Sequence, residues 1–158
     1  MKNIFLSIQK KLSEVTELKH IDKNWSQLLY EKPPVKFPCA LLNITGINYS
    51  QLGVLAQDAN GIVEITIANH RLKNSSGKAP RKEEAYMVFD VIEKMHQLLQ
   101  GWTNNEFQPL VRTSIQKLDA SYCYEIYKVS YQTSWRVFKE TDQAPVQIKT
   151  LVLTPEIK

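Results

Sequence analysis

The sequence predicts an α+β fold in which two helices pack on one mostly antiparallel sheet of about four to six strands. Two segments repeat apolar residues every three or four positions, as amphipathic helices do, and other segments alternate apolar and polar residues, as half-buried strands do. Their order along the chain is helix, strands, helix, strands. We expect residues 1–140 to form a single α+β domain and residues 141–158 to form a C-terminal extension.

Length and composition indicate one globular domain and exclude several other classes. The chain has 158 residues, of which 43% are hydrophobic and 23% are charged, the usual balance of a soluble domain. No apolar run approaches the roughly 20 residues of a membrane-spanning helix. The apolar start, Met1–Leu6, is too short for a signal peptide. We therefore expect a protein of the cytosol with no membrane partner.

The first half of the chain predicts one helix and three strands. The apolar face of the helix comprises Ile4, Phe5, Ile8, Leu12 and Val15. A short strand is expected at His20–Trp25, and the three prolines of segment 32–38 should keep that segment extended and solvated. The next strand, Cys39–Tyr49, starts with a continuous apolar run that suits burial on both faces. Gly61–His70 alternates more regularly and should be half-buried.

The second half of the chain predicts a long helix and two strands. The helix is expected at Arg81–Gln100, with Gly101 as the residue that ends it. Its apolar face comprises Ala85, Val88, Phe89, Ile92, Met95, Leu99 and Trp102. The strands are Leu110–Leu118 and Tyr122–Phe138. On the second strand, the odd-numbered residues Tyr127, Val129, Tyr131, Trp135 and Val137 should face the core, and the even-numbered residues should face water or another subunit.

No set of residues predicts catalysis, a metal site or a cofactor. His20, His70 and His96 are isolated, and no two of them have the spacing of metal ligands. We expect His96 to be a hydrogen-bonded histidine at the edge of the core. Cys39 and Cys123 have no nearby base or cation that would activate a thiol, so both should be reduced and buried. The common nucleotide, nucleophile and zinc motifs are absent, and we expect no enzyme and no cofactor.

Positive charge is concentrated in the loop before the second helix. Five of the 20 basic residues lie there without any acidic residue, so the remaining 15 nearly balance the 16 acidic residues of the chain. The five are Arg71, Lys73, Lys78, Arg81 and Lys82. The loop is either an ordinary solvated loop or a basic arm that meets an acidic surface or a phosphate backbone. No aromatic residues are interleaved with the charges, which disfavours single-strand binding by stacking.

Two consecutive segments carry a resemblance to a known family. Residues 21–27 (Ile-Asp-Lys-Asn-Trp-Ser-Gln) combine a short strand with an aromatic residue and a glutamine, and Pro33–Leu42 is a proline-rich approach to a long strand. In these features and in the order of its elements, the chain resembles phage tail terminator (tail completion) proteins over residues 1–140. These are small α+β subunits of prophages and tailed phages.

The resemblance implies a structural role in a virion tail and no catalytic turnover. The implied assembly is a homo-oligomeric ring, a hexamer, that caps the tail tube and joins it to the head. Its implied partners are further copies of the chain, the tail tube protein and the head–tail connector protein, with nucleic acid not expected. The implied location is the virion tail, and the bacterial host cytoplasm during assembly. Two alternatives remain open: another head–tail connector or neck subunit, and a small basic nucleic-acid-binding module.

A ring of identical subunits needs two different contact surfaces on each subunit. We expect the polar face or the edge of the sheet to supply one of them, with Tyr124, Lys128, Gln132 and Arg136 as the candidate residues. The β-like segment Val146–Leu153 should clamp a neighbouring subunit through Val146, Ile148, Leu151 and Leu153. The basic loop is the candidate contact with the tail tube or the connector.

Overall fold

The computed structural model describes residues 1–70, 76, 78, 80, 82–119 and 124–139. The elements are α1 (Lys2–Leu12), β1 (His20–Lys23), the 3-10 helix η1 (Gln27–Leu29), β2 (Cys39–Gly53), β3 (Ala56–His70), the 3-10 helix η2 (Lys82–Tyr86), α2 (Met87–Leu99), β4 (Val111–Leu118) and β5 (Tyr124–Phe138). The predicted α+β class, with two helices and a mostly antiparallel sheet, is confirmed.

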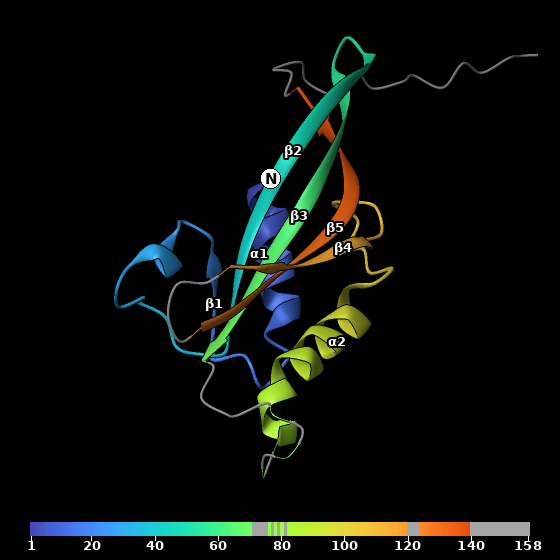
Figure 1. The fold of residues 1–158 in the computed structure, drawn as a ribbon. Helices are drawn as coiled ribbons and strands as arrows, with labels where there is room; N and C mark the ends of the chain where they lie inside the picture. The colour runs from blue at the N-terminus through green and yellow to red at the C-terminus, as the bar shows by residue number, and fades with distance from the viewer. Residues whose placement is uncertain (71–75, 77, 79, 81, 120–123, 140–158) are drawn as a thin grey trace, which may run out of the picture.

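The five strands form one sheet in the order β1-β2-β3-β5-β4. β1 runs parallel to β2, and every other pair is antiparallel. Both α-helices lie on one face of this sheet, and the end of the β2–β3 hairpin projects beyond them (Figure 1). β5 supports the hairpin along its whole length, since it pairs with every residue of β3.

The main core lies between the helices and the sheet. Its helical part comprises Ile4, Ile8 and Leu12 of α1 and Val88, Val91, Ile92, Met95 and Leu99 of α2. On β5, Tyr127, Val129, Tyr131 and Trp135 are buried in this core as predicted. Val137 was expected there too, but its side chain is 38% exposed. It lies opposite Gln57, in the hairpin end that the helices do not cover.

The second helix differs from the prediction at its start and on its apolar face. A 3-10 turn occupies residues 82–86, and the α-helix begins only at Met87. Phe89 is 45% exposed and packs against Tyr127, whereas Val91 is buried. Each residue turns an α-helix by about 100°, so Phe89 lies beside the face that Val88 and Val91 share. Gly101 ends the helix as predicted, with a positive φ of 73°.

The hairpin strands are longer than the sequence pattern predicts. β2 continues from Tyr49 to Gly53, and β3 begins at Ala56 instead of Gly61. The added residues are mostly polar or small and show no clear alternation, so nothing in their pattern indicates strands. The added residues of β3 pair with β5, and those of β2 pair in turn with β3, which holds both in the sheet.

The proline-rich stretch is partly buried, in contrast to the solvated segment expected. Phe37 and Pro38 are joined by a cis peptide bond, and Pro38 is buried. Val35 and Phe37 pack on a second, smaller core on the sheet face away from the helices. This core comprises Cys39, Leu41 and Ala68. Because β2 starts with apolar residues on both faces, the preceding chain has to cover the face that the helices leave open.

Candidate subunit interface

The structure places four of the predicted interface residues on one face of β5. Tyr124, Lys128, Gln132 and Arg136 alternate with the residues that enter the main core, so they lie on the sheet face away from the helices. Their partners across β3 are His70, Thr66, Ile62 and Asp58. The other four predicted residues, Val146, Ile148, Leu151 and Leu153, lie outside the described part of the chain.

Tyr124 belongs to the covered end of this face. Its ring stacks on Phe37 with centroids 4.8 Å apart, and His70 lies 5.1 Å from it. Leu28 and Ile126 pack on the same small core. Tyr124 therefore holds the proline-rich stretch against its own sheet, a role that the sequence pattern did not indicate.

The rest of the face is polar except for the partly exposed Ile62, and its charges are largely paired within the subunit. Lys128 Nζ lies 3.1 Å from Glu64 Oε1, and Arg136 Nε lies 3.6 Å from Asp58 Oδ1. Gln132 is exposed between these two ion pairs. A face of neutralised charge pairs and amides can meet another protein surface without leaving an unpaired charge buried.

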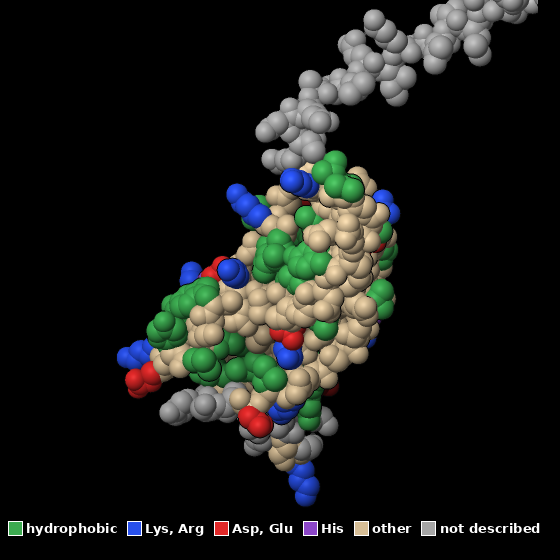
Figure 2. Space-filling view, turned by 90° about the horizontal axis from the view of Figure 1, so that it is seen from above, with side chains coloured by type: hydrophobic (Ala, Val, Ile, Leu, Met, Phe, Trp, Pro, Cys, Tyr) green, Lys and Arg blue, Asp and Glu red, His purple; other side chains and the backbone are tan. Residues whose placement is uncertain are grey.

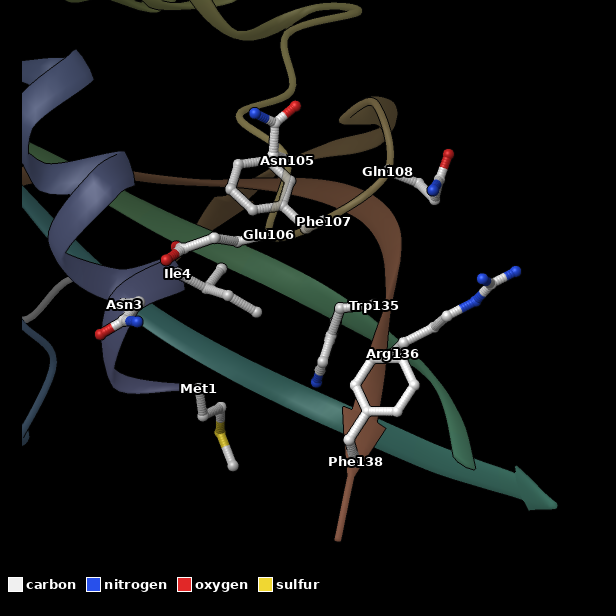
Figure 3. A pocket seen from close by; sticks show the side chains of 10 residues that line it. All are labelled: Met1, Asn3, Ile4, Asn105, Glu106, Phe107, Gln108, Trp135, Arg136 and Phe138. Atoms are coloured by element: carbon white, nitrogen blue, oxygen red, sulfur yellow. The ribbon is translucent and has the colours of Figure 1, made fainter. Parts of the chain in front are cut away.

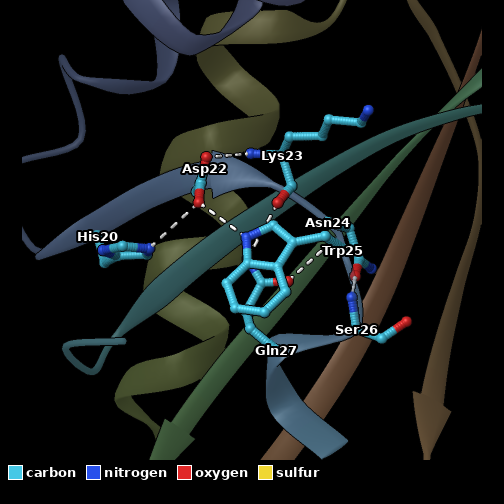
Figure 4. A network of polar contacts seen from close by, with 7 residues as sticks. All are labelled: His20, Asp22, Lys23, Asn24, Trp25, Ser26 and Gln27. Atoms are coloured by element: carbon cyan, nitrogen blue, oxygen red, sulfur yellow. Dashed lines mark hydrogen bonds and ion pairs between the residues drawn. The ribbon is translucent and has the colours of Figure 1, made fainter. Parts of the chain in front are cut away.

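A buried glutamine fixes the turn that follows β1 (Figure 4). Gln27 is fully buried, its Oε1 accepts the backbone N–H of Trp25 at 2.8 Å, and its Nε2 donates to the carbonyl of Lys23 at 2.9 Å. The indole Nε1 of Trp25 donates to Asp22 Oδ2 at 3.2 Å. These hydrogen bonds fix the conformation of the segment that carries the family resemblance, and we call them the Gln27 lock. The side chain of Trp25 remains 49% exposed.

The hairpin end exposes an apolar surface that the sequence analysis missed. Five large side chains are exposed there: Tyr49, Leu52, Val54, Leu55 and Phe138. Val54 is 93% exposed, and the backbone N–H of Lys139 donates to the Leu55 carbonyl at 2.9 Å, which places the end of β5 beside the turn. Hydrophobic side chains reach the surface in several separate patches when the molecule is seen from this end (Figure 2).

A groove of about 540 Å³ lies where α1, the loop before β4 and the end of β5 meet (Figure 3). Ile4, Phe107 and Trp135 form its apolar floor, and Glu106 and Arg136 stand at its rim.

Among the described residues, no group of three or more His, Cys, Asp or Glu side chains could hold a metal ion. No helix in the described part of the chain is long and apolar enough to cross a membrane.

The basic loop lies mostly outside the described residues. Arg71, Lys73 and Arg81 fall in undescribed positions, Lys78 is exposed, and Lys82 begins η2. The structure therefore does not test the predicted contact of this loop with a partner.

The cysteine prediction is confirmed for Cys39. This residue is fully buried with a free thiol, and burial raises the pKa of the thiol to about 11. Cys123 lies outside the described residues.

His96 is less well satisfied than predicted. Its ring stacks near Tyr131, and its buried Nδ1 has no hydrogen-bond partner in the described structure. Burial lowers the pKa of His96 below 6.5, with Arg112 acting in the same direction and Glu93 opposing it. The folded state therefore binds fewer protons here than the unfolded state, and stability should fall as the pH drops below 6.5.

Replacing His96 with Phe tests this pH dependence. The Phe ring keeps the contact with Tyr131 but cannot take up a proton. We expect the free energy of unfolding of the wild type to fall more steeply between pH 7.5 and 5.5 than that of the His96→Phe variant, measured by urea denaturation. Parallel pH profiles for the two proteins would contradict the assignment.

Comparisons with known proteins give a likeness of fold. No family model matches the chain, and no curated protein matches it. Among solved structures, 26 chains are similar. One of them belongs to the virion of a native gene transfer agent particle; it aligns with a TM-score of 0.52 and 6% identity, over 82% of this chain and 92% of that chain. At this identity, the match shows a shared fold.

Proposed function

We propose that the chain is a structural subunit of a phage-like virion that acts as a tail terminator. Identical copies form a hexameric ring that caps the tail tube and joins it to the head. The tail tube protein and the head–tail connector protein are its partners. The subunit acts through its shape and its contact surfaces, without catalysis, in the virion tail and, during assembly, in the host cytoplasm.

The observation that carries this proposal is the fold likeness to a chain of a gene transfer agent virion. The match spans 92% of that chain, so the compared unit is nearly the whole subunit and not a shared fragment. The family resemblance at residues 21–42 supports the proposal from the sequence alone. A different connector or neck subunit of the same kind of particle is the nearest alternative, because the likeness does not distinguish the components of a virion.

Each subunit of the ring has to present two different surfaces, since the contact is heterologous. The polar face around Gln132 is one candidate, because its charges are already paired within the subunit. The apolar hairpin end is the other, because contact with another subunit would remove its five exposed apolar side chains from water.

Native mass spectrometry across a concentration series, with negative-stain images of the same samples, tests this proposal. We expect hexamers or rings to appear as the concentration rises. The Gln132→Arg variant, which adds an unpaired charge to the polar face, should shift the population towards monomers. The Gln97→Arg variant places the same charge on the exposed surface of α2 and should assemble like the wild type.

The alternative functions give different results in the same samples. A small nucleic-acid-binding module would stay monomeric and bind DNA with a steep salt dependence. Monomers at every concentration, together with salt-dependent DNA binding, would overturn the proposed function.

A further inference from the structure

Among the described residues, no strand lies beside most of β2 at one edge of the sheet. β1 pairs only with Cys39–Leu42 of β2, and no other described strand continues along this edge. A bulge interrupts β2 between Thr45 and Asn48, and side chains of Asn43 and Asn48 hydrogen-bond to backbone groups near it. Beyond this bulge, Asn48–Gln51 and Gly53 pair on their other side with β3, with a second irregularity between Gln51 and Gly53. No described strand pairs with their outer edge.

Apart from its bulges, the described part of this edge has none of the usual protections against pairing with another chain. Natural edge strands carry charges, prolines, bulges or covering segments, because a bare edge recruits other strands. Residues 43–53 contain no charged residue and no proline. The opposite edge strand, β4, carries Arg112 and Lys117, and the N–H of Arg112 is already capped by Gln100 at 3.0 Å.

The chain itself contains a segment with the character of a missing strand. Val146–Leu153 lies between Pro145 and Pro155, and its even-numbered positions are all β-branched: Val146, Ile148, Thr150 and Val152. Lys139, the last described residue, lies beside the hairpin turn, since its N–H donates to the carbonyl of Leu55. The 19 residues after it can extend up to roughly 60 Å, well beyond the subunit's own hairpin end.

We propose that the β2 edge at Asn48–Gly53 accepts the Val146–Leu153 segment of a neighbouring copy of this chain as an added strand. The inference rests on the proposed ring, in which this strand exchange would join each subunit to the next. Each subunit donates one strand and accepts one, so this contact is itself heterologous and adds to the two candidate surfaces named above. Main-chain hydrogen bonds hold the added strand, as in other cases of strand addition to a sheet edge.

Cross-linking between two differently labelled chains tests the contact. All chains carry Cys123→Ser and keep the buried Cys39. One chain adds Ser50→Cys on the β2 edge, and the other adds a cysteine at Ile148, Thr150 or Val152, so that three registers are sampled. We expect a disulfide-linked two-chain product when the two are mixed at assembling concentrations. Ser114→Cys on β4 serves as the control acceptor and should give none.

A proline substitution measures the contribution of the added strand. Ile148→Pro removes a backbone donor from the segment and should weaken association about tenfold or more, the effect of losing one to two net hydrogen bonds. Ile157→Pro lies outside the segment and should assemble like the wild type.

The possible outcomes separate this inference from the proposed function. Rings that form equally well with Ile148→Pro would overturn the strand exchange and leave the ring standing. If mixtures that form rings give no cross-link, the strand exchange is likewise overturned and the ring stands. A wild-type chain that never oligomerises would overturn the ring itself.

Discussion

Replacing Gln27 with Ala should lower the free energy of unfolding by about 3 kcal/mol. The amide of this fully buried side chain bonds the N–H of Trp25 and the carbonyl of Lys23, and both groups would lose their partner. A buried polar group left without a partner costs about 1–3 kcal/mol, and a small cavity adds to that cost. Urea denaturation of the wild type and the variant measures the difference.

Two further variants separate the hydrogen bonds of Gln27 from its packing. Gln27→Met fills a similar volume without either hydrogen bond, so it should recover only the packing part of the loss. Gln57→Ala removes an exposed glutamine of β3 and should change stability by less than about 0.5 kcal/mol. A Gln27→Met protein as stable as the wild type would show that the lock does not depend on its hydrogen bonds.

The Gln27 lock also shows what the sequence could and could not predict about this region. The pattern indicated a short strand at His20–Trp25 and an extended approach to β2, and the structure confirms a strand at His20–Lys23. The burial of a glutamine and of Pro38 depends on an apolar sheet face that the helices leave uncovered. Which sheet face stays uncovered depends on the tertiary arrangement, so no local sequence pattern predicts that these two residues are buried.

Long elements with a strong period were predicted well, but where they begin was predicted less well. The core residues of β5 were identified from alternation, except for Val137, and the end of α2 was identified from Gly101. The start of α2 was placed at Arg81 because the 3.6-residue period continues through η2, although the backbone there winds as a 3-10 helix. A sequence period does not distinguish these two windings over a single turn.

The candidate interface was predicted only in part, for a related reason. The even-numbered face of β5 follows directly from the alternation of a strand, and the structure places its four residues on one face, with Tyr124 packed against Phe37 at one end. The exposed hairpin end was missed because residues 56–60 hold their strand conformation through pairing with β5, which lies more than 60 residues further along the chain, and residues 50–53 pair in turn with β3. Ion pairs such as Lys128–Glu64 likewise depend on strand register.

Replacing Gly61 with Ala should also destabilise the fold strongly, by about 1–3 kcal/mol. An added Cβ would lie 2.8 Å from Cη2 of Trp135 and 3.4 Å from Cγ1 of Ile47. Trp135 is 6% exposed and forms part of the main core, so its ring cannot move without disturbing that packing. Gly53→Ala is the matched control, since a Cβ there meets nothing within 4 Å.

A double-mutant cycle identifies the cause of the loss at Gly61. Trp135→Phe removes the ring atoms nearest the new methyl group, so Gly61→Ala should cost clearly less in that background than in the wild type. Equal costs in the two backgrounds would mean that contact with the indole is not responsible. Gly61 lies on β3 between the part of the sheet that the helices cover and the projecting hairpin end. If Trp135→Phe reduces the loss of stability caused by Gly61→Ala, close packing of β3 on β5 supports the hairpin end.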